Sequence, residues 1–282
     1  MIVNLISDTV TKPSDGMLEA MFAAQVGDDV FKEDLSVNTL EIEVAELFGM
    51  EAALFFPSGT MANQTAIKLH TQPGEQLICD HYAHVYNYEG GGVSFNSGVS
   101  CRLIEGDRGR ITATQIADCI NPPDFYHSPK TSLVCLENTT NKGGGACYEM
   151  DEIIKIATKY KLKVIEDCAQ ATGAMYKGKK AGSIGDGGCH SFYPTKILGA
   201  YGDGGFITTN NKKLFEKMHR FRFYGIDTLG INKKWKNKYY SIDQGMNSRL
   251  NEVQSAILNL KLKKLPGSIK RRREIAKKYF EG

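Results

Sequence analysis

Residues 51–75, EAALFFPSGTMANQTAIKLHTQPGE, contain the pattern from which the fold is predicted. The apolar run 52–56 predicts a short buried strand, and the residues from Pro57 to Thr60 predict a turn. The apolar spacing from Met61 to His70 then predicts a helix. A strand, a turn and a helix in this order form the repeating unit of α/β proteins.

Strand-like and helix-like segments continue to alternate along most of the chain. This alternation predicts an α/β layer fold, with a mostly parallel sheet and helices on both faces. Ligands of such sheets bind beyond the carboxyl ends of the strands, so residues that directly follow strands are candidates for a site. The other predicted strands are 76–79, 101–104, 132–136 and 164–165, and the predicted helices are 40–48, ending at Gly49, 150–157, 214–221 and 250–258, with a break at Pro266-Gly267.

The composition is that of a globular protein large enough to enclose a cleft. Of the 282 residues, 41% are apolar and 24% are charged. We expect no membrane partner and no signal peptide, because the chain has no run of about 18 apolar residues and no basic segment before an apolar one. The seven cysteines contain no C-x-x-C pair. This arrangement favours reduced thiols and a cytoplasmic location.

Basic residues are concentrated near the end of the chain. Residues 261–278 hold nine lysines and arginines and one acid, whereas the whole chain has a net charge of +3. A basic segment can bind nucleic acid, but no aromatic residues or nucleic-acid motif accompany this one. We therefore interpret it as a solvent-exposed helix face and expect no nucleic-acid partner.

Several common motifs of enzymes are absent from the sequence. It contains no P-loop, no G-x-G-x-x-G after a strand and no G-x-S-x-G. His81 and His84 are three residues apart, but no acidic residue or cysteine has metal-ligand spacing to them. No metal site is therefore predicted.

Three groups of residues that carry chemistry follow predicted strands. Ser58-Gly59-Thr60 offers amide groups and two hydroxyls that suit a phosphate, and it would also suit an ordinary helix cap. Asp167 could hold a pyridine nitrogen protonated, or it could form a cap or a salt bridge. Lys196 could form a Schiff base, although most lysines are simply solvated. In this order, the three groups are those that a pyridoxal 5′-phosphate (PLP) site requires, and PLP is the predicted cofactor.

At this point the chain resembles two families. Residues 1 to about 149 resemble low-specificity threonine aldolases, through ISDTVTKPS, QVGDDVFKED, EAALFFPSGTMANQTAIKLHTQPGE, HVYNYEGGG and LVCLENTTNKGGGACYE. Residues from about 150 to 282 resemble the DegT/DnrJ/EryC1/StrS sugar aminotransferases, through VIEDCAQATGA, YKGKKAGSIGD, SFYPTKILGAYGDGGFITTN, NSRLNEVQSAIL and RRREIAKKY. Both families have the fold type I PLP architecture. The resemblance implies a mosaic with a seam near residue 150.

The resemblance also implies a domain organisation. A PLP-binding large domain is expected over residues 1–248. A linking helix and the start of a C-terminal small domain are expected over residues 249–282. Each family continues into a complete small domain that helps to close the site, so we expect most of that domain to be missing.

The aldolase-like stretches imply roles for five residues. Ser58, Gly59 and Thr60 would bind the PLP phosphate. His84 would stack on the cofactor ring and act as a base, or it could be a core histidine. Ser7 would contact the carboxylate of an amino-acid substrate.

The aminotransferase-like stretches imply a second set of roles. Lys196 would carry the cofactor as a Schiff base, and Asp167 would pair with the pyridine nitrogen. Gln170 would bond near the ring hydroxyl, and Ser191 would contact the phosphate. Asn247 would reach the phosphate of a neighbouring subunit in a homodimer, or it could cap the helix that follows it.

The sequence departs from both families, and three hypotheses follow. Threonine aldolases have an arginine three residues after the pyridine-binding Asp, where this chain has Gln170, and losing that carboxylate partner disfavours aldol cleavage. The favoured hypothesis is therefore a PLP-dependent aminotransferase that acts on a nucleotide-linked keto-sugar with an amino acid as donor. The alternatives are a threonine aldolase, and a chain with the PLP fold but little or no activity.

Overall fold

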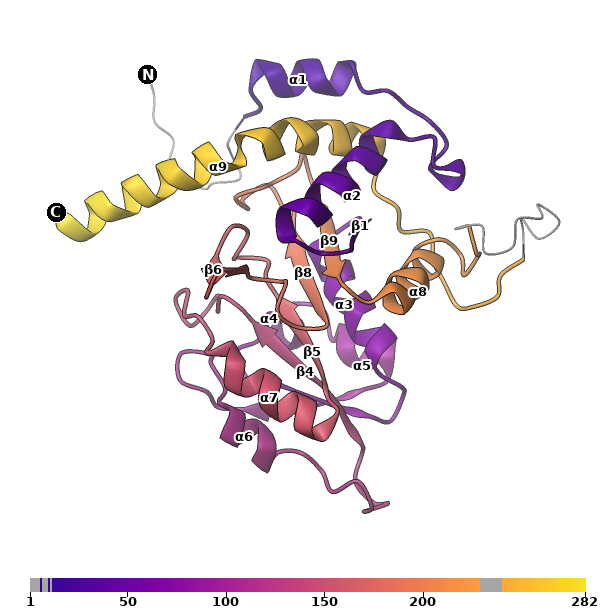
Figure 1. Ribbon diagram of the computed structural model, residues 1–282, viewed down its shortest axis with the longest axis vertical. Helices are drawn as coiled ribbons and strands as arrows, with labels where there is room; N and C mark the ends of the chain where they lie inside the picture. The colour runs from indigo at the N-terminus through magenta and orange to yellow at the C-terminus, as the bar shows by residue number, and fades with distance from the viewer. Residues whose placement is uncertain (1–5, 7–9, 11, 229–239) are drawn as a thin grey trace.

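The computed structural model describes residues 6, 10, 12–228 and 240–282 of the chain. Its centre is a seven-stranded sheet with helices on both faces (Figure 1). A short hairpin lies outside this sheet. From edge to edge the sheet contains β1 (Ala52–Phe56), β9 (Gly205–Thr209), β8 (Gly187–Ser191), β5 (Lys163–Asp167), β4 (Thr131–Glu137), β2 (Gln76–Asp80) and β3 (Ser100–Ile104), and the hairpin contains β6 (Met175–Tyr176) and β7 (Lys179–Lys180).

Five neighbouring strands, from β8 to β3, run parallel, which confirms the predicted mostly parallel sheet. Strand β9 is antiparallel to both of its neighbours. The sequence pattern did not predict β8 or β9, because their glycines and polar residues interrupt the apolar run that marks a buried strand. All residues of β8 and β9 are nevertheless buried, because the two strands lie between β1 and β5 in the sheet.

Two layers of helices cover the sheet, and the alternation of side chains along the strands explains both layers. Leu54 and Phe56 point into the core beneath one layer, whereas Phe55 points into the core beneath the other. The first layer contains α3 (Gly59–His70), α5 (Gly92–Ser97) and α8 (Lys212–Arg222). The second contains α2 (Leu35–Phe48), α6 (Ala113–Asp118), α7 (Met150–Tyr160) and the first half of α9 (Glu252–Glu281), and the remaining helices are α1 (Asp15–Phe22), α4 (His84–Asn87) and a 3-10 turn at Asp29–Phe31.

The predicted strands all exist, within two residues at either end. Helices were also predicted in the right places, and Gly49 ends α2 because it adopts a left-handed conformation with φ of 65°. The predicted break at Pro266 is wrong, because α9 runs unbroken through this residue. Proline removes one hydrogen bond of a helix, but Leu262 and Leu265 are buried against the core on the preceding turn and hold the helix in place.

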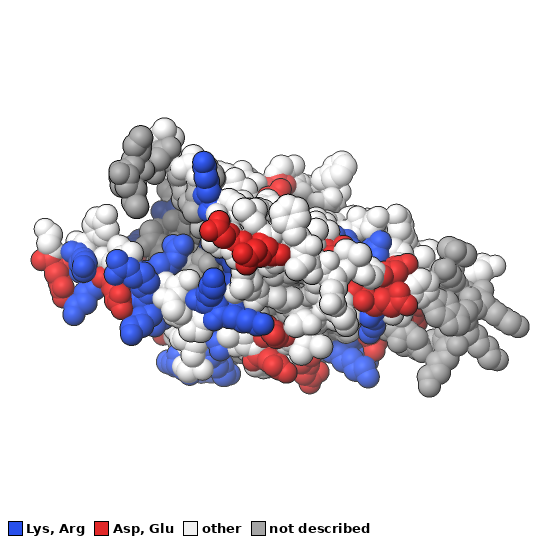
Figure 2. Space-filling model, turned by 90° about the horizontal axis from the view of Figure 1, so that it is seen from above, with Lys and Arg blue, Asp and Glu red and all other residues white. Residues whose placement is uncertain are grey.

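The basic residues near the end of the chain lie on α9. Apart from Lys261 they are exposed, as expected for a solvated helix face. Figure 2 shows these lysines and arginines gathered where α9 extends beyond the rest of the molecule. None of the described helices is long and apolar enough to cross a membrane.

His190 is a histidine in an apolar environment between α2 and the sheet. Its ring stacks on Phe206 with 4.3 Å between the centroids and meets the edge of Phe48 at 4.6 Å. Neither ring nitrogen has a hydrogen-bond partner among the described residues. Because the charged ring would lose its water here, burial lowers the pKa of His190 to about 3.

This burial predicts a loss of stability in acid. In the unfolded chain the pKa of His190 is about 6.5, whereas in the folded chain it is about 3. The free energy of unfolding therefore falls as the pH drops through this window, by up to about 1.4 kcal/mol per pH unit. We expect His190→Leu to reduce the slope of unfolding free energy against pH, measured by urea denaturation between about pH 6 and pH 4.

The exposed His127 provides the matched control, and His127→Leu should leave the slope unchanged. His219, whose pKa burial also lowers to about 3, should retain part of the slope in both variants. Equal slopes for wild type and His190→Leu would contradict the assignment to His190.

Candidate functional site

A cavity of about 320 Å³ lies where strands β4, β5 and β8 end. Its position agrees with the expectation that ligands bind at the carboxyl ends of parallel strands. It is lined by residues that are far apart in the sequence and that were predicted to act together: Ser58, Gly59, Thr60, His84, Gln170, Ser191 and Lys196.

The first turn of α3 forms one end of the cavity. Ser58 is the N-cap residue of this helix, and its Oγ accepts a hydrogen bond of 3.0 Å from the amide of Met61. The helix-cap interpretation is therefore correct for Ser58, and the amide groups of the first turn still lack partners within the helix. A Cβ atom on Gly59 would lie 2.7 Å from Cβ of Ser191. Only glycine lets α3 begin this close to the end of β8.

Asp167 lies at the end of β5, beneath the cavity, and is 2% exposed. Its Oδ1 accepts a hydrogen bond of 3.1 Å from the amide of Ala169, and its Oδ2 accepts one of 3.0 Å from Nδ2 of Asn63. Burial, with the nearby Glu89 carboxylate as a second cause, raises the pKa of Asp167 to about 6. The carboxylate is thus held rigidly by two donors in a place where a positively charged partner would stabilise it.

His84 belongs to a hydrogen-bond network that the sequence did not reveal. Glu89, whose side chain is fully buried, accepts hydrogen bonds from Asn63 at 2.8 Å and from Gln64 at 2.7 Å. Nδ1 of His84 lies 2.9 Å from Oε1 of Glu89, and this hydrogen bond raises the pKa of His84. The imidazole is therefore fixed in orientation and favoured in its charged form, so His84 is not simply a core histidine.

Asn63 connects this network to the carboxylate beneath the cavity. Its Nδ2 donates to both Glu89 and Asp167, and its Oδ1 is buried without a hydrogen-bond partner among the described residues. Asn63 could have been predicted, because it follows Gly59 by four residues and so lies on the same face of α3. The ligand atoms of His84, Glu89 and Asp167 lie within 4.8 Å of one another. The Asn63 amide already donates to both carboxylates of this group.

Glu137 adds a further acidic group to the cavity wall. It ends β4, directly beside Asp167 in the register of the sheet. Burial, together with the charge of Asp167, raises the pKa of Glu137 to about 7. The site can therefore hold a proton on a carboxyl group close to neutral pH.

Lys196 projects from the segment between β8 and β9 and is half-buried at the cavity. Tyr193, Thr195 and Asp203, from the same segment, line the cavity beside it. Gln170 follows β5 and is exposed at the cavity wall, three residues after Asp167. Among the described residues that line this cavity there is no arginine.

Besides Asp167, which is buried and does not itself line the cavity, two predicted site residues are not found there. Ser7 lies outside the described residues. Asn247 is exposed and forms an isolated β-bridge with Phe223, and it lines a different pocket with Asp29 and Arg249. It does not cap α9, because Asn251 is the N-cap residue and accepts the Gln254 amide at 2.9 Å. The contact of Asn247 with a neighbouring subunit stays a prediction.

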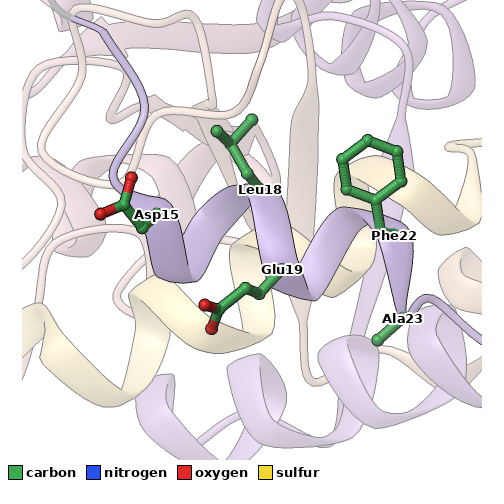
Figure 3. A pocket seen from close by; sticks show the side chains of 5 residues that line it. All are labelled: Asp15, Leu18, Glu19, Phe22 and Ala23. Atoms are coloured by element: carbon green, nitrogen blue, oxygen red, sulfur yellow. The ribbon is translucent and has the colours of Figure 1, made fainter.

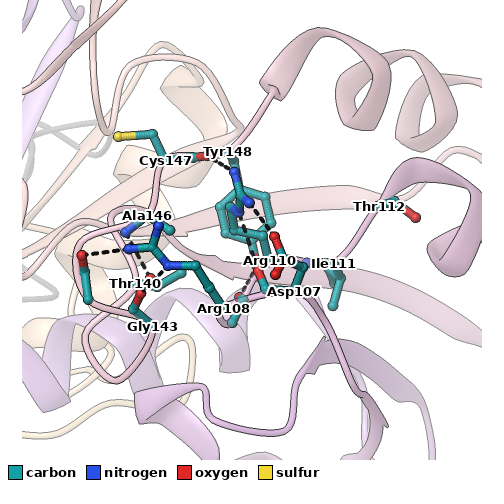
Figure 4. A network of polar contacts seen from close by, with 12 residues as sticks. Asp107, Arg108, Arg110, Ile111, Thr112, Thr140, Gly143, Ala146, Cys147 and Tyr148 are labelled. Carbon is teal, nitrogen blue, oxygen red and sulfur yellow. Dashed lines mark hydrogen bonds and ion pairs between the residues drawn. The ribbon is translucent and has the colours of Figure 1, made fainter.

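The segment after β4 forms another part of the wall, and Figure 4 shows how it is held. Nε and Nη2 of Arg108 donate to the carbonyl groups of Gly143 and Gly144 at 3.0 and 3.1 Å. The hydroxyl of Tyr148 donates to the carbonyl of Gly109 at 2.7 Å. These contacts fix the glycine-rich segment that contains Asn141, which lines the cavity.

A second cavity, of about 560 Å³, lies on α1 (Figure 3). Leu18 and Phe22 stand on one side of the helix there, and Phe22 is 85% exposed. The lining consists of apolar groups and two acids, and none of the predicted site residues reaches it. The cavity at the strand ends is therefore the candidate functional site, although it is smaller.

The residues of this site fit PLP. A helix N-terminus with two hydroxyls suits the phosphate, and a buried carboxylate suits the pyridine nitrogen. The half-buried Lys196 lines the same cavity as the helix N-terminus, and the carboxylate of Asp167 is bonded to Asn63 in the cavity wall. The buried Oδ1 of Asn63 needs a hydrogen-bond donor, which a ligand in the cavity can provide.

Solved structures with the same fold include aminotransferases. The Streptomyces venezuelae protein DesV, in complex with a ketimine intermediate, has a TM-score of 0.76 and 26% identity, over 94% of this chain and 65% of that chain. A DegT DnrJ EryC1 StrS aminotransferase from Brucella abortus has a TM-score of 0.78 over 94% of this chain and 68% of that chain. Its identity of 24% shows the fold alone.

Curated relatives include proteins of both groups that the sequence resembles. A probable low-specificity L-threonine aldolase 2 of Arabidopsis thaliana is 41% identical over 179 residues, which are 61% of this chain and 50% of that protein. The dTDP-3-amino-3,6-dideoxy-alpha-D-galactopyranose transaminase of Aneurinibacillus thermoaerophilus is 52% identical over 138 residues, which are 49% of this chain and 35% of that protein. The chain thus spans half or less of the length of these relatives.

Both predicted resemblances are confirmed as similarities by these comparisons. The family model described as beta-eliminating lyase matches residues 4–214, which are more than half of the chain. The chain therefore belongs to the beta-eliminating lyase family.

Proposed function

We propose that this chain binds PLP at Lys196 and carries out the amino-group transfer of a sugar aminotransferase. The observation that carries this proposal is the single cavity that unites Lys196, Gln170 and Ser191 with the first turn of α3. The 52% identity to a dTDP-sugar transaminase supports it. The substrates would be an amino acid as donor and a nucleotide-linked keto-sugar as acceptor.

When bound, PLP would supply an electron sink that stabilises negative charge on the substrate carbon. The hydroxyls of Ser58 and Thr60 and the amide groups of α3 would bind its phosphate. Asp167, held by Asn63, would keep a proton at the pyridine nitrogen. That positive charge would in turn lower the pKa of Asp167 from its raised value and keep the carboxylate ionised.

His84 and Lys196 would have different roles at the cofactor. The Glu89 hydrogen bond would hold the His84 imidazole flat against the cofactor ring. Nζ of Lys196 would hold the cofactor and, once released, would be the base that moves a proton between Cα of the amino acid and C4′ of the cofactor, two carbon atoms that a nitrogen separates. Gln170 would orient the ring by a hydrogen bond near its hydroxyl group.

A threonine aldolase is the second candidate, and the His84–Glu89 pair favours it. Both residues lie in HVYNYEGGG, within the stretch that resembles aldolases, and the aldolase relatives are about as similar in sequence as the transaminases. Against it stands Gln170, which offers a neutral amide where aldolases have an arginine to bind the substrate carboxylate. A chain that folds but has little activity is the third candidate.

The resemblance also supports proposals about assembly and location. We expect a cytoplasmic homodimer, in which Asn247 would approach the phosphate of the neighbouring site and Ser7 the substrate carboxylate. The large domain would extend to residue 248, with a family seam near residue 150.

Lys196→Ala should abolish covalent attachment of PLP while leaving the protein folded. The physical reason is that only an amine can form the Schiff base, and Lys196 is the lysine at the cavity. We expect borohydride to fix PLP on the Lys196 peptide of wild type, detected by mass spectrometry, and not on the variant. Lys213→Ala, on the exposed side of α8, is the control and should retain the label. Label elsewhere in the Lys196→Ala chain, at wild-type amount, would refute the assignment.

An absorbance titration separates the three candidate functions. PLP is added to the purified protein and the long-wavelength band of lysine-bound cofactor is followed. L-glutamate without an acceptor should then abolish this band and yield pyridoxamine phosphate, because an aminotransferase completes half of its reaction with the donor alone. Glycine and acetaldehyde from L-threonine would establish the aldolase instead. Failure of wild type to develop the band would favour the inactive chain.

A further inference from the structure

Lys196 lies on a loop that closes on itself. We call residues 192–204 the lysine loop. The amide of Phe192 donates to the carbonyl of Gly204 at 2.7 Å, and the amide of Ala200 donates to the carbonyl of Phe192 at 2.6 Å. These bonds join the two ends of the loop. Tyr201 lies between the two bonded residues Ala200 and Gly204, and its own backbone groups bond to a different element.

That element is the first part of α9. Oε1 of Gln254 accepts a hydrogen bond of 2.7 Å from the amide of Tyr201, and Nε2 of Gln254 donates to the carbonyl of the same residue. Nζ of Lys261, two turns further along α9, donates to the carbonyl of Gly199. The side-chain amide of Gln254 thus bonds to both the backbone N–H and the backbone carbonyl of Tyr201. These two bonds fix the orientation of the backbone at this residue.

Gln254, which provides both the donor and the acceptor, belongs to a helix that is packed firmly against the core. Ile257, Leu258 and Leu262 of α9 are buried, and the last two share a core cluster with Leu40 and Val44 of α2. Gln254 itself lies in the first turn of α9, where the Asn251 cap holds its backbone. A side chain that is half-buried on a packed helix loses little further freedom when it forms hydrogen bonds.

We propose that Gln254 is a positioning residue that holds the lysine loop so that Lys196 is presented to the cofactor, with Lys261 in a supporting part. The proposal rests on the proposed function, because it assumes that PLP attaches to Lys196. Gln254 does not line the cavity, and it acts only through the loop. Helix α9 would thereby support the PLP site, although none of its described residues lines the cavity.

The test compares Gln254→Ala with a control on the same helix. Asn259 also bonds from α9 to a backbone carbonyl, that of Ser36 at 2.9 Å, but it does not touch the lysine loop. The first measurement is hydrogen exchange of the peptides that cover residues 199–204, in protein without PLP. Two lost hydrogen bonds should speed this exchange about tenfold in Gln254→Ala, and Asn259→Ala should behave as wild type.

The second measurement is the rate at which each protein captures PLP on Lys196, followed by borohydride reduction and mass spectrometry. We expect Gln254→Ala to capture PLP about tenfold more slowly than wild type, with Asn259→Ala unchanged. Gln254→Glu keeps the acceptor for the Tyr201 amide and loses the donor to the Tyr201 carbonyl. Its rate of PLP capture should therefore lie between those of wild type and Gln254→Ala. This variant also decides the matter if Gln254→Ala does not fold.

The outcomes distinguish the positioning role from the proposed function. If wild type captures PLP and the Gln254 variants capture it equally fast, the positioning role is refuted and the function stands. If wild type captures no PLP on Lys196, the proposed function fails and the positioning role fails with it. Faster exchange and slower capture in Gln254→Ala alone would establish the role.

Discussion

The candidate site depends on a close approach of the start of α3 to the end of β8 and the start of β9. A Cβ atom on Gly205 would lie 2.6 Å from the carbonyl oxygen of Ser58, and one on Gly59 would lie 2.7 Å from Ser191. Two glycines therefore let the helix begin directly against β8 and β9. Because of this approach, the first turn of α3 lines the same cavity as the lysine after β8, and Asn63 of α3 reaches the carboxylate at the end of β5. A bulkier residue at either position would push the first turn of α3 away from the strands and the lysine.

Acidic side chains surround the inner end of the site: Glu89 and Glu137 line the cavity, and Asp167 is buried next to them. Glu89, Glu137 and Asp167 are each less than a tenth exposed, and protein groups donate hydrogen bonds to the carboxylates of Glu89 and Asp167. Buried carboxylates without a charged partner destabilise the folded protein. A ligand whose ring carries positive charge would provide that partner. Asn63 joins two of these carboxylates and ties residues of the aldolase-like stretch to Asp167 of the aminotransferase-like stretch.

The sequence predicted those parts of the fold and the site that depend on local patterns. Apolar runs identified β1 and β2, and the order of turn, acid and lysine identified Ser58-Gly59-Thr60 and Lys196 at the cavity. The family resemblance, and not the local pattern, added His84, Gln170 and Ser191. Strands β8 and β9 were missed because their neighbours in the sheet, and not their own apolar content, keep them buried. Glu89 was missed because nothing in its spacing marks it as a partner of His84. The unbroken α9 shows the same limitation, since packing of Leu262 and Leu265 outweighs the local effect of Pro266.

The place of β1 in the sheet has a consequence for synthesis of the chain. Its strand partner is β9, and the register joins Ala52 to Thr209. While the ribosome makes the residues between them, the apolar strand AALFF has no edge to pair with, although the helices next to it can already form. Such a strand is a site for pairing with another unfinished chain. Folding of this half of the sheet must therefore wait until β9 has left the ribosome, and until then β1 is a segment that a chaperone would be expected to bind.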